Sequence, residues 1–166
     1  MVNNCKKIAN ICAIAVAVIL CIVIIVVIYK QVDEHYSQSD PKLQELKAKF
    51  EEFFAQESYW TSPLDMLNNR NIMSDIKLYR GDKSYTINKQ KVYICLKDEK
   101  GQYYNDNMLV YVIAHEIAHS LCSEIGHTEM FHTIFEALLV KLKEYGLYDP
   151  SIPIDLEYCE NGDPEI

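Results

Sequence analysis

The first thirty residues differ from the rest of the chain in their pattern of apolar and polar positions. Residues 11–28 are eighteen consecutive apolar residues, and Asn10 is the only polar residue between positions 8 and 29. A helix of about 20 apolar residues crosses the roughly 30 Å hydrocarbon core of a bilayer. A cleaved signal peptide has an apolar region of about 7–15 residues followed by small residues, whereas this segment ends in IIVVIYK. We therefore expect residues 1–30 to be an uncleaved single-pass anchor, with residues 8–29 in the membrane.

Charged residues beside the anchor predict its orientation. Lys6 and Lys7 precede the apolar segment, whereas Lys30 follows it and is itself followed by Asp33 and Glu34. Lysine and arginine concentrate on the cytoplasmic side of membrane anchors. The N-terminus is therefore expected in the cytoplasm, and the remainder of the chain on the opposite side of the membrane.

Beyond the anchor, the pattern predicts a short linker and one folded domain. Residues 31–40 are polar and show no periodicity, which indicates a linker. Residues 41–166 have the length of one ordinary domain. Pro41 suits the first turn of a helix that Ser39 or Asp40 would cap. The apolar face of this helix is formed by Leu43, Leu46, Phe50, Phe53 and Phe54.

Three strands and two longer helices are expected after this first helix. The strand-like segments are residues 75–79, 84–87 and 92–96, which are separated by turn residues. A helix from Asn107 to about Ile125 is apolar nearly all round and is therefore expected to be buried. Such a succession of elements indicates an α+β fold.

Glycine and threonine positions mark the ends of the two longer helices. Gly126 suits the C-terminal end of the buried helix, because glycine adopts the left-handed conformation there. Thr128 can cap the following helix, which carries an apolar stripe at helical spacing and ends at Gly146.

The charge of the domain excludes one class of partner. Thirteen of the 16 Lys and Arg residues and all 24 Asp and Glu residues lie beyond residue 30, so the net charge of this part is about −11. An acidic surface repels phosphate backbones. We therefore expect no nucleic-acid binding.

Cysteines do not predict a disulfide framework. Only Cys95, Cys122 and Cys159 lie in the domain, and an odd number cannot pair fully within one chain. Cys122 lies one turn beyond His119, but a cysteine at such a position is more often a small buried apolar residue than a metal ligand.

Four of the five histidines fall between positions 115 and 132. His115 and His119 are four residues apart in a predicted helix, so they project from one face about one turn apart. That separation allows both imidazoles to bind one Zn²⁺ at about 2.0–2.1 Å. Glu116 lies about 100° further round the helix, where it can accept a proton from a metal-bound water and return it to a leaving amine. The HExxH pattern therefore predicts zinc-dependent peptide hydrolysis.

A catalytic zinc site needs a third protein ligand and an open position for water. We favour His127, because Gly126 lets the chain reverse and places His127 near the open end of the metal face. His132 is the competitor, although it falls on the side of the next helix away from the apolar stripe. A downstream glutamate is a further alternative, and Glu136 shares the exposed face with His132.

The segment HEIAH at residues 115–119, followed by GHTEMF at residues 126–131, resembles the WLM and SprT-like zincins. In that group a third histidine follows the HExxH helix, and an aromatic residue packs the next helix. The lead-in from residue 91 resembles the small WLM-type proteins encoded by large DNA viruses. The resemblance covers residues 91–142 and implies a minimal zincin-like domain, a small sheet packed on the HExxH helix and a following helix. It implies zinc ligands His115, His119 and His127, a catalytic Glu116 and a structural Phe131.

Two departures limit the resemblance. The spacing is not the HExxHxxGxxH of metzincins, because Cys122 and Ile125 stand where the glycine and the third histidine would be. Members of the wider group that cleave DNA–protein crosslinks have basic surfaces and no membrane anchor, whereas this chain is acidic and carries a predicted anchor.

We therefore expect a membrane-anchored zinc metallopeptidase that acts on a protein or peptide substrate in a virion or host-derived membrane. The substrate would lie extended along an edge strand, for which residues 93–96 are favoured. The oxyanion-stabilising residue remains open among several tyrosines, which are Tyr103, Tyr104, Tyr111, Tyr145 and Tyr148.

The alternative is a non-catalytic virion or membrane structural protein in which zinc only stabilises the fold. Structural zinc sites are usually closed, with four ligands and many cysteines. Such a role would not require Glu116, which argues against this alternative. No feature of the sequence indicates an oligomeric state.

Overall fold

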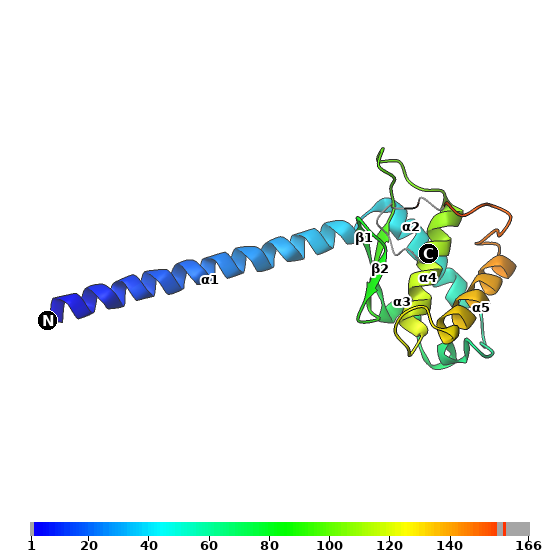
Figure 1. The fold of residues 1–166 in the computed structure, drawn as a ribbon, viewed down its shortest axis with the longest axis horizontal. Coiled ribbons are helices and arrows are strands. Elements are labelled where there is room, and N and C mark those ends of the chain that lie inside the picture. Colours follow the sequence, from blue (N-terminus) through cyan, green and yellow to red (C-terminus); the bar gives the residue numbers. More distant parts are fainter. Residues whose placement is uncertain (1, 156–157, 159–166) are drawn as a thin grey trace. The chain divides into compact units, whose positions relative to one another are not determined.

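The chain divides into two compact units, residues 1–36 and residues 37–166. The computed structural model describes residues 2–155 and residue 158, with side chains from residue 11 onward. The first unit is a single helix, α1 (Val2–Gln38), which continues into the first two residues of the second unit (Figure 1).

Within α1, residues 11–38 are long and apolar enough to cross a membrane, and no residue in their most apolar 18-residue stretch is buried. A signal sequence near the N-terminus meets the same criteria of length and composition. By those two criteria, the described residues contain one helix able to span a membrane.

Residues 31–38 are helical, although we expected an irregular linker over residues 31–40. No glycine or proline interrupts the sequence before Pro41. Once a helix has formed in the apolar segment, each further residue adds one hydrogen bond. The helix therefore continues through the polar residues, and the non-helical junction is reduced to Ser39 and Asp40.

The second unit contains one small mixed sheet. Its strands are β1 (Lys77–Gly81), β2 (Tyr85–Ile87) and β3 (Lys91–Cys95), in the order β1-β3-β2. β1 runs parallel to β3 and β2 runs antiparallel to it. The β2–β3 hairpin turns through residues 88–90, where Asn88 and Lys89 both have left-handed φ angles, of 51° and 57°.

β3 is the central strand, so the expectation that residues 93–96 offer an edge to a peptide is wrong. Val92 pairs with Leu78 of β1 on one side and with Thr86 of β2 on the other. The reason is the tight hairpin, which places β2 beside β3, while β1 occupies the other side of β3. Among the described strands, the sheet edges are β1 and β2.

Five helices accompany the sheet in the described part of the second unit. They are α2 (Pro41–Gln56), η1 (Asp65–Asn69), α3 (Ile72–Asp75), α4 (Asp106–Leu121) and α5 (Glu129–Tyr145). Several predicted ends are confirmed. Asp40 caps α2 by accepting from Lys42 N at 3.0 Å, Thr128 caps α5, and Gly146 ends α5 with φ +84°.

The structure corrects two predicted boundaries. α4 ends at Leu121 rather than near Ile125, because Cys122 adopts an extended conformation (φ −65°, ψ 131°). Gly126 has a left-handed φ of +83°, but it bends the loop after α4 instead of ending the helix. Asp75, predicted to begin a strand, is the last residue of α3.

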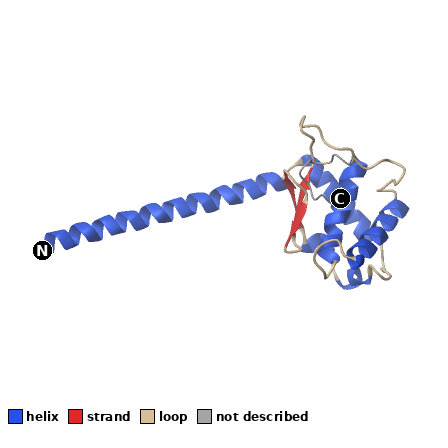
Figure 2. Ribbon diagram, viewed as in Figure 1, coloured by secondary structure: helices blue, strands red, loops and turns tan. Residues whose placement is uncertain are grey.

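α4 forms the centre of the core. It packs against β2 and β3 and against α5, while α2 packs against β1 and α3, and Figure 2 shows these helices beside the sheet. Ile113, Ile117 and Ala118 of α4 are fully buried, as are Val92 and Ile94 of β3. The second unit is therefore an α+β domain with a small mixed sheet, and the histidines of α4 lie on its most buried element.

Cys95, at the end of β3, is disulfide-bonded, and its partner is not among the described residues. The odd number of cysteines did not predict this bond. Cys122 is a free thiol and is buried, as expected for a small apolar position.

Candidate metal centre

α4 places His115 and His119 on one face, one turn apart. Asn105 begins the helix by accepting a hydrogen bond from Met108 N at 2.8 Å. The Nε2 atoms of His115 and His119 lie 3.1 Å apart. His115 is only 2% exposed, whereas His119 is partly buried, so the pair lies at the boundary between core and surface.

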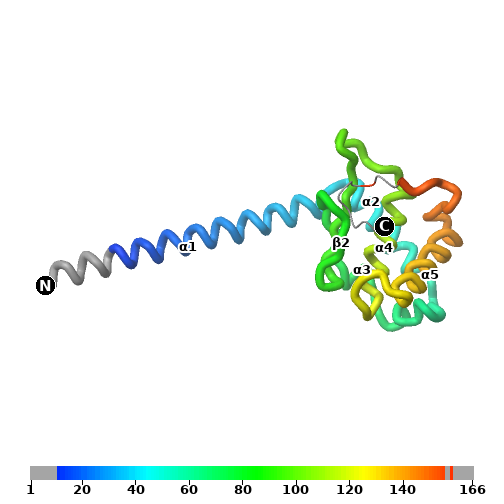
Figure 3. The backbone as a smooth tube through the Cα atoms, viewed as in Figure 1, coloured from blue at the N-terminus to red at the C-terminus, as the bar shows by residue number. Residues whose placement is uncertain are grey.

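The loop between α4 and α5, visible as a tube in Figure 3, carries the third histidine. The His127 Nε2 atom lies 3.0 Å from that of His115 and 3.1 Å from that of His119. His127 directly precedes Thr128, the N-cap of α5, so the start of α5 restricts the position of the His127 backbone. The three Nε2 atoms thus form a nearly equilateral triangle.

This triangle fits one metal ion. Three imidazoles bound to one tetrahedral Zn²⁺ at 2.0–2.1 Å have nitrogen atoms roughly 3.3 Å apart, close to the separations of 3.0–3.1 Å between these atoms. In a neutral imidazole each ring nitrogen is either a donor or an acceptor. Any two of three converging Nε2 atoms that have the same role cannot hydrogen-bond to each other, so the three atoms cannot all pair among themselves. Among the described residues, no carboxylate or thiol belongs to this cluster.

Aromatic rings of α5 pack against the histidines. The Phe131 ring stacks on His119 at 4.3 Å between centroids and contacts His115 and His127 at 4.9 and 4.8 Å. Phe135 adds an edge contact to His115 at 5.2 Å. Phe131 is 1% exposed, so the apolar stripe of α5 restricts the orientation of all three rings.

Burial keeps His115 neutral. Loss of hydration, reinforced by the neighbouring histidines, lowers the pKa of His115 to about 3. An imidazole that stays neutral at physiological pH keeps a nitrogen lone pair available to a metal.

Glu116 lies on the sheet side of α4. It is 2% exposed, and its Oε2 accepts a hydrogen bond from Thr86 Oγ1 of β2 at 2.6 Å. Thr86 was not identified from the sequence. The signal is the alternation along β2, where Tyr85 and Ile87 are exposed and Thr86 between them is partly buried.

Tyr158 is a second residue that the sequence did not indicate. Its hydroxyl donates to Cys95 O and lies 2.8 Å from Ser84 Oγ. Burial raises the pKa of Tyr158, and the nearby Tyr104 and Glu116 raise it further, against the effect of the hydrogen bond from Ser84. Tyr158 is thus a buried phenol whose hydroxyl is held by Ser84 and Cys95.

The alternative ligands lie outside the cluster. His132 and Glu136 are exposed on α5, and the His132 ring lies 6.3 Å from that of His127. Tyr103, one of the tyrosines considered for stabilising the oxyanion, donates a hydrogen bond from its hydroxyl to Asp40 Oδ1 at 3.1 Å.

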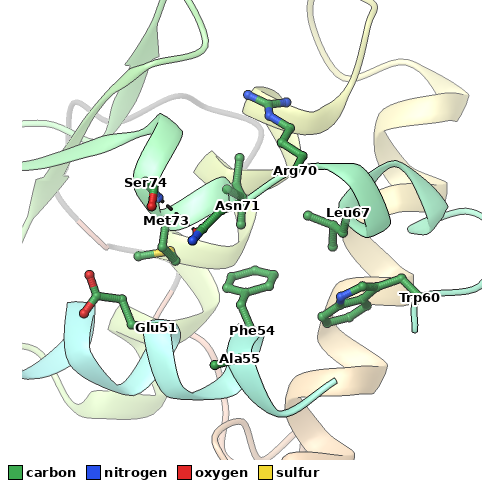
Figure 4. Close-up of a pocket in the computed structure, with 10 residues that line it drawn as sticks. Glu51, Phe54, Ala55, Trp60, Leu67, Arg70, Asn71, Met73 and Ser74 are labelled. Atoms are coloured by element: carbon green, nitrogen blue, oxygen red, sulfur yellow. Dashed lines mark hydrogen bonds between the residues drawn. The ribbon is translucent and has the colours of Figure 1, made fainter. Parts of the chain in front are cut away.

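A separate pocket of about 400 Å³ lies between α2, η1 and α3 (Figure 4). Phe54 and Trp60 line it together with Arg70 and Met73, and no histidine of the cluster does. Arg70 connects this region to the end of α4, because its guanidinium donates to Ser120 O at 3.3 Å.

The fold and the site define an α+β domain with a candidate three-histidine metal site. No family model matches the chain, and no solved structure matches it. It is 50% identical to an uncharacterized protein of Invertebrate iridescent virus 6 over 103 residues, which cover 60% of this chain and 58% of that protein.

Two further viral proteins are similar. An uncharacterized protein of Invertebrate iridescent virus 3 is 43% identical over 98 residues, 58% of this chain and 62% of its own length. An uncharacterized protein of Acanthamoeba polyphaga mimivirus is 32% identical over 142 residues, 77% of this chain and 65% of its own length. The chain thus spans about three fifths of the length of the first two relatives.

Proposed function

We propose that this chain is a zinc metallopeptidase of the WLM/SprT-like zincin type. The observation that carries the proposal is the convergence of three histidine Nε2 atoms within 3.1 Å of one another. The helix α4, which carries two of these histidines, also carries the buried Glu116. Hydrolytic zinc sites combine three protein ligands, an open position and a nearby carboxylate. His115, His119 and His127 would hold the ion.

The protein groups around the ion have distinct roles in this proposal. Zinc, when bound, lowers the pKa of a coordinated water towards about 7 and polarises a carbonyl. Glu116 accepts a proton from the attacking water and later donates it to the leaving amine. Phe131 and Phe135 hold the imidazole rings and keep water away from their buried faces.

β2 is the favoured site for the substrate backbone. It is a sheet edge and lies against α4, the helix that carries Glu116. An extended peptide can add to such an edge through backbone hydrogen bonds. Because β3 lies between β1 and β2 in the sheet, β2 replaces residues 93–96 in this role.

The first unit and the relatives support a membrane location in a virus-encoded protein. α1 has the length and composition of a membrane span, and the similar proteins are viral. The domain would lie opposite a cytoplasmic N-terminus, in a virion or host-derived membrane. Its net negative charge argues against a nucleic-acid partner.

The test combines metal analysis with cleavage assays on the full-length chain in detergent micelles. Wild-type protein should bind one zinc per chain and cleave members of a quenched-fluorescence peptide library. Glu116→Gln should keep the zinc and lose cleavage by at least about 100-fold, because it removes the proton acceptor. Cleavage at the wild-type rate by this variant would refute the mechanism. Stoichiometric zinc with no cleavage by wild type would instead favour the structural role.

A further inference from the structure

The β2–β3 hairpin contacts α4 at two separate points, one at Glu116 and one beyond His119. At the first point, Thr86 Oγ1 lies 2.6 Å from Glu116 Oε2 and 3.3 Å from Glu116 O. A hydroxyl has one proton to donate. The shorter distance assigns that proton to the carboxylate.

The strand directs Thr86 towards α4. Side chains alternate between the two faces of a strand. Tyr85 and Ile87 are 43% and 41% exposed, whereas Val92, the partner of Thr86 on β3, is fully buried. Thr86 therefore faces the core side, where a threonine hydroxyl needs an acceptor, and the acceptor is a buried carboxylate.

We propose that Thr86 is a positioning residue for Glu116. Its hydrogen bond fixes the rotation of the carboxylate by holding Oε2. Hydrogen bonds to an ionised acceptor are shorter and stronger than neutral ones, so the bond can fix a side chain in one rotamer. This inference rests on the proposed function, in which Glu116 moves the proton.

Replacement of the hydroxyl tests this role. Thr86→Val keeps the shape of the side chain and removes the donor, so kcat should fall about tenfold with KM and zinc content unchanged. Thr86→Ser keeps the donor and should recover most of kcat. Thr133→Val is the matched control and should leave kcat unchanged, because Thr133 is at an exposed position of α5, where its Oγ1 donates to the Glu129 carbonyl oxygen at 2.8 Å.

A second readout does not depend on activity. In metal-free protein, Thr86→Val should lower Tm in the wild-type background and lower it less in the Glu116→Gln background, because the contact involves the carboxylate. Equal Tm losses in the two backgrounds, or a kcat equal to that of wild type, would overturn the positioning role. Absence of cleavage by wild type would overturn the proposed function itself, and the Tm comparison would still decide whether Thr86 holds Glu116.

The second contact is made by the turn of the hairpin. The Lys89 ammonium donates to Cys122 O and, at 3.0 Å, to Ser123 O. These carbonyls directly follow α4, where a cation is favourable because the carbonyls lack helical partners. They also begin the loop of residues 122–128 that carries His127.

We infer that Lys89 holds this loop so that His127 reaches the other two histidines. The observation is independent of Thr86 and requires only the metal site, without catalysis. Lys89→Met keeps the apolar stem of the side chain and removes the charge, so the affinity for zinc should fall about tenfold, within the range for outer partners of a metal site. Lys89→Arg should recover most of it.

The zinc affinity is measured on the full-length chain by competition with a chromophoric chelator. Lys83→Met, a change at an exposed lysine before the same hairpin, is the control and should bind zinc like wild type. Far-UV circular dichroism of the metal-free protein shows whether each variant has folded. An unchanged affinity in folded Lys89→Met, or an equal loss in Lys83→Met, would overturn the inference.

Discussion

α4 and the loop of residues 122–128 both supply histidines to the candidate metal centre, yet they hold them in different ways. His115 and His119 are fixed by helical hydrogen bonds and by the core, which buries nearly every residue of α4. His127 lies on a loop that also contains Ile125, which is 92% exposed. Lys89 holds the backbone of this loop at Cys122 and Ser123. A rigid element thus supplies two histidines of the cluster, and a loop held by side-chain contacts supplies the third.

The largest effect is expected from removal of a ligand in either region. His119→Ala and His127→Ala should each lower zinc affinity more than about 100-fold, since changes even in outer partners cost about 10–100-fold. His132→Ala is the control, because His132 is exposed and outside the cluster. Chelator competition measures all three. Wild-type affinity in His127→Ala would show that the loop supplies no ligand.

The next effect concerns the stability of the two regions. Ile113→Ala removes a fully buried side chain of α4 and should lower the free energy of unfolding by about 2–5 kcal/mol. Ile125→Ala removes an exposed side chain from the loop and should change it by less than about 0.5 kcal/mol. Chemical denaturation of the metal-free protein measures both. Similar losses would mean that the loop belongs to the core.

The pH dependence of stability reports on His115 of α4. Its folded-state pKa of about 3 is below the ordinary value of 6.5, so below pH 6.5 the unfolded chain binds a proton that the folded chain does not. The free energy of unfolding of metal-free protein should therefore fall by about 1.4 kcal/mol per pH unit, or about 2 kcal/mol between pH 6.5 and 5. Denaturation at several pH values measures the slope. His115→Gln should remove most of it, and an unchanged slope in that variant would assign it elsewhere.

The smallest effect tests the conformation of the loop. Gly126 has φ +83° with no atom within 4 Å of an added Cβ, so Gly126→Ala costs about 1 kcal/mol through backbone strain alone. Gly101→Ala is a matched control, because Gly101 has φ +76° and equally open surroundings. Both variants should lose similar stability, but only Gly126→Ala should weaken zinc binding in the chelator assay. Equal zinc affinities would indicate that the loop absorbs the strain without moving His127.

The sequence predicted those features that depend on local spacing. Helical periodicity indicated that His115 and His119 share a face, and the caps at Asp40, Thr128 and Gly146 followed from residue type. Local rules were sufficient because each of these features is determined within one or two helical turns.

Features that depend on distant segments were missed. The position of β3 between two partners depends on a parallel pairing with β1 that leaves no local signal. α4 was predicted four residues too long, because its end depends on the extended backbone at Cys122 and on the hairpin contact from Lys89. Thr86 contacts Glu116 from a segment 30 residues away in the sequence, and Tyr158 contacts Ser84 and Cys95 from 74 and 63 residues away, which no periodicity reveals.

β2 has three residues, so a peptide added to its edge gains only a few backbone hydrogen bonds. At about 1 kcal/mol net for each bond, a dissociation constant of about 1 mM, which corresponds to about 4 kcal/mol, is the tightest that the edge alone provides. Confinement of two proteins to one membrane raises their effective concentration, and short tethers give values of about 1 mM. For the proposed peptidase, a substrate embedded in the same bilayer as α1 would therefore reach half-saturation, whereas a dilute soluble protein with the same cleavage sequence would escape.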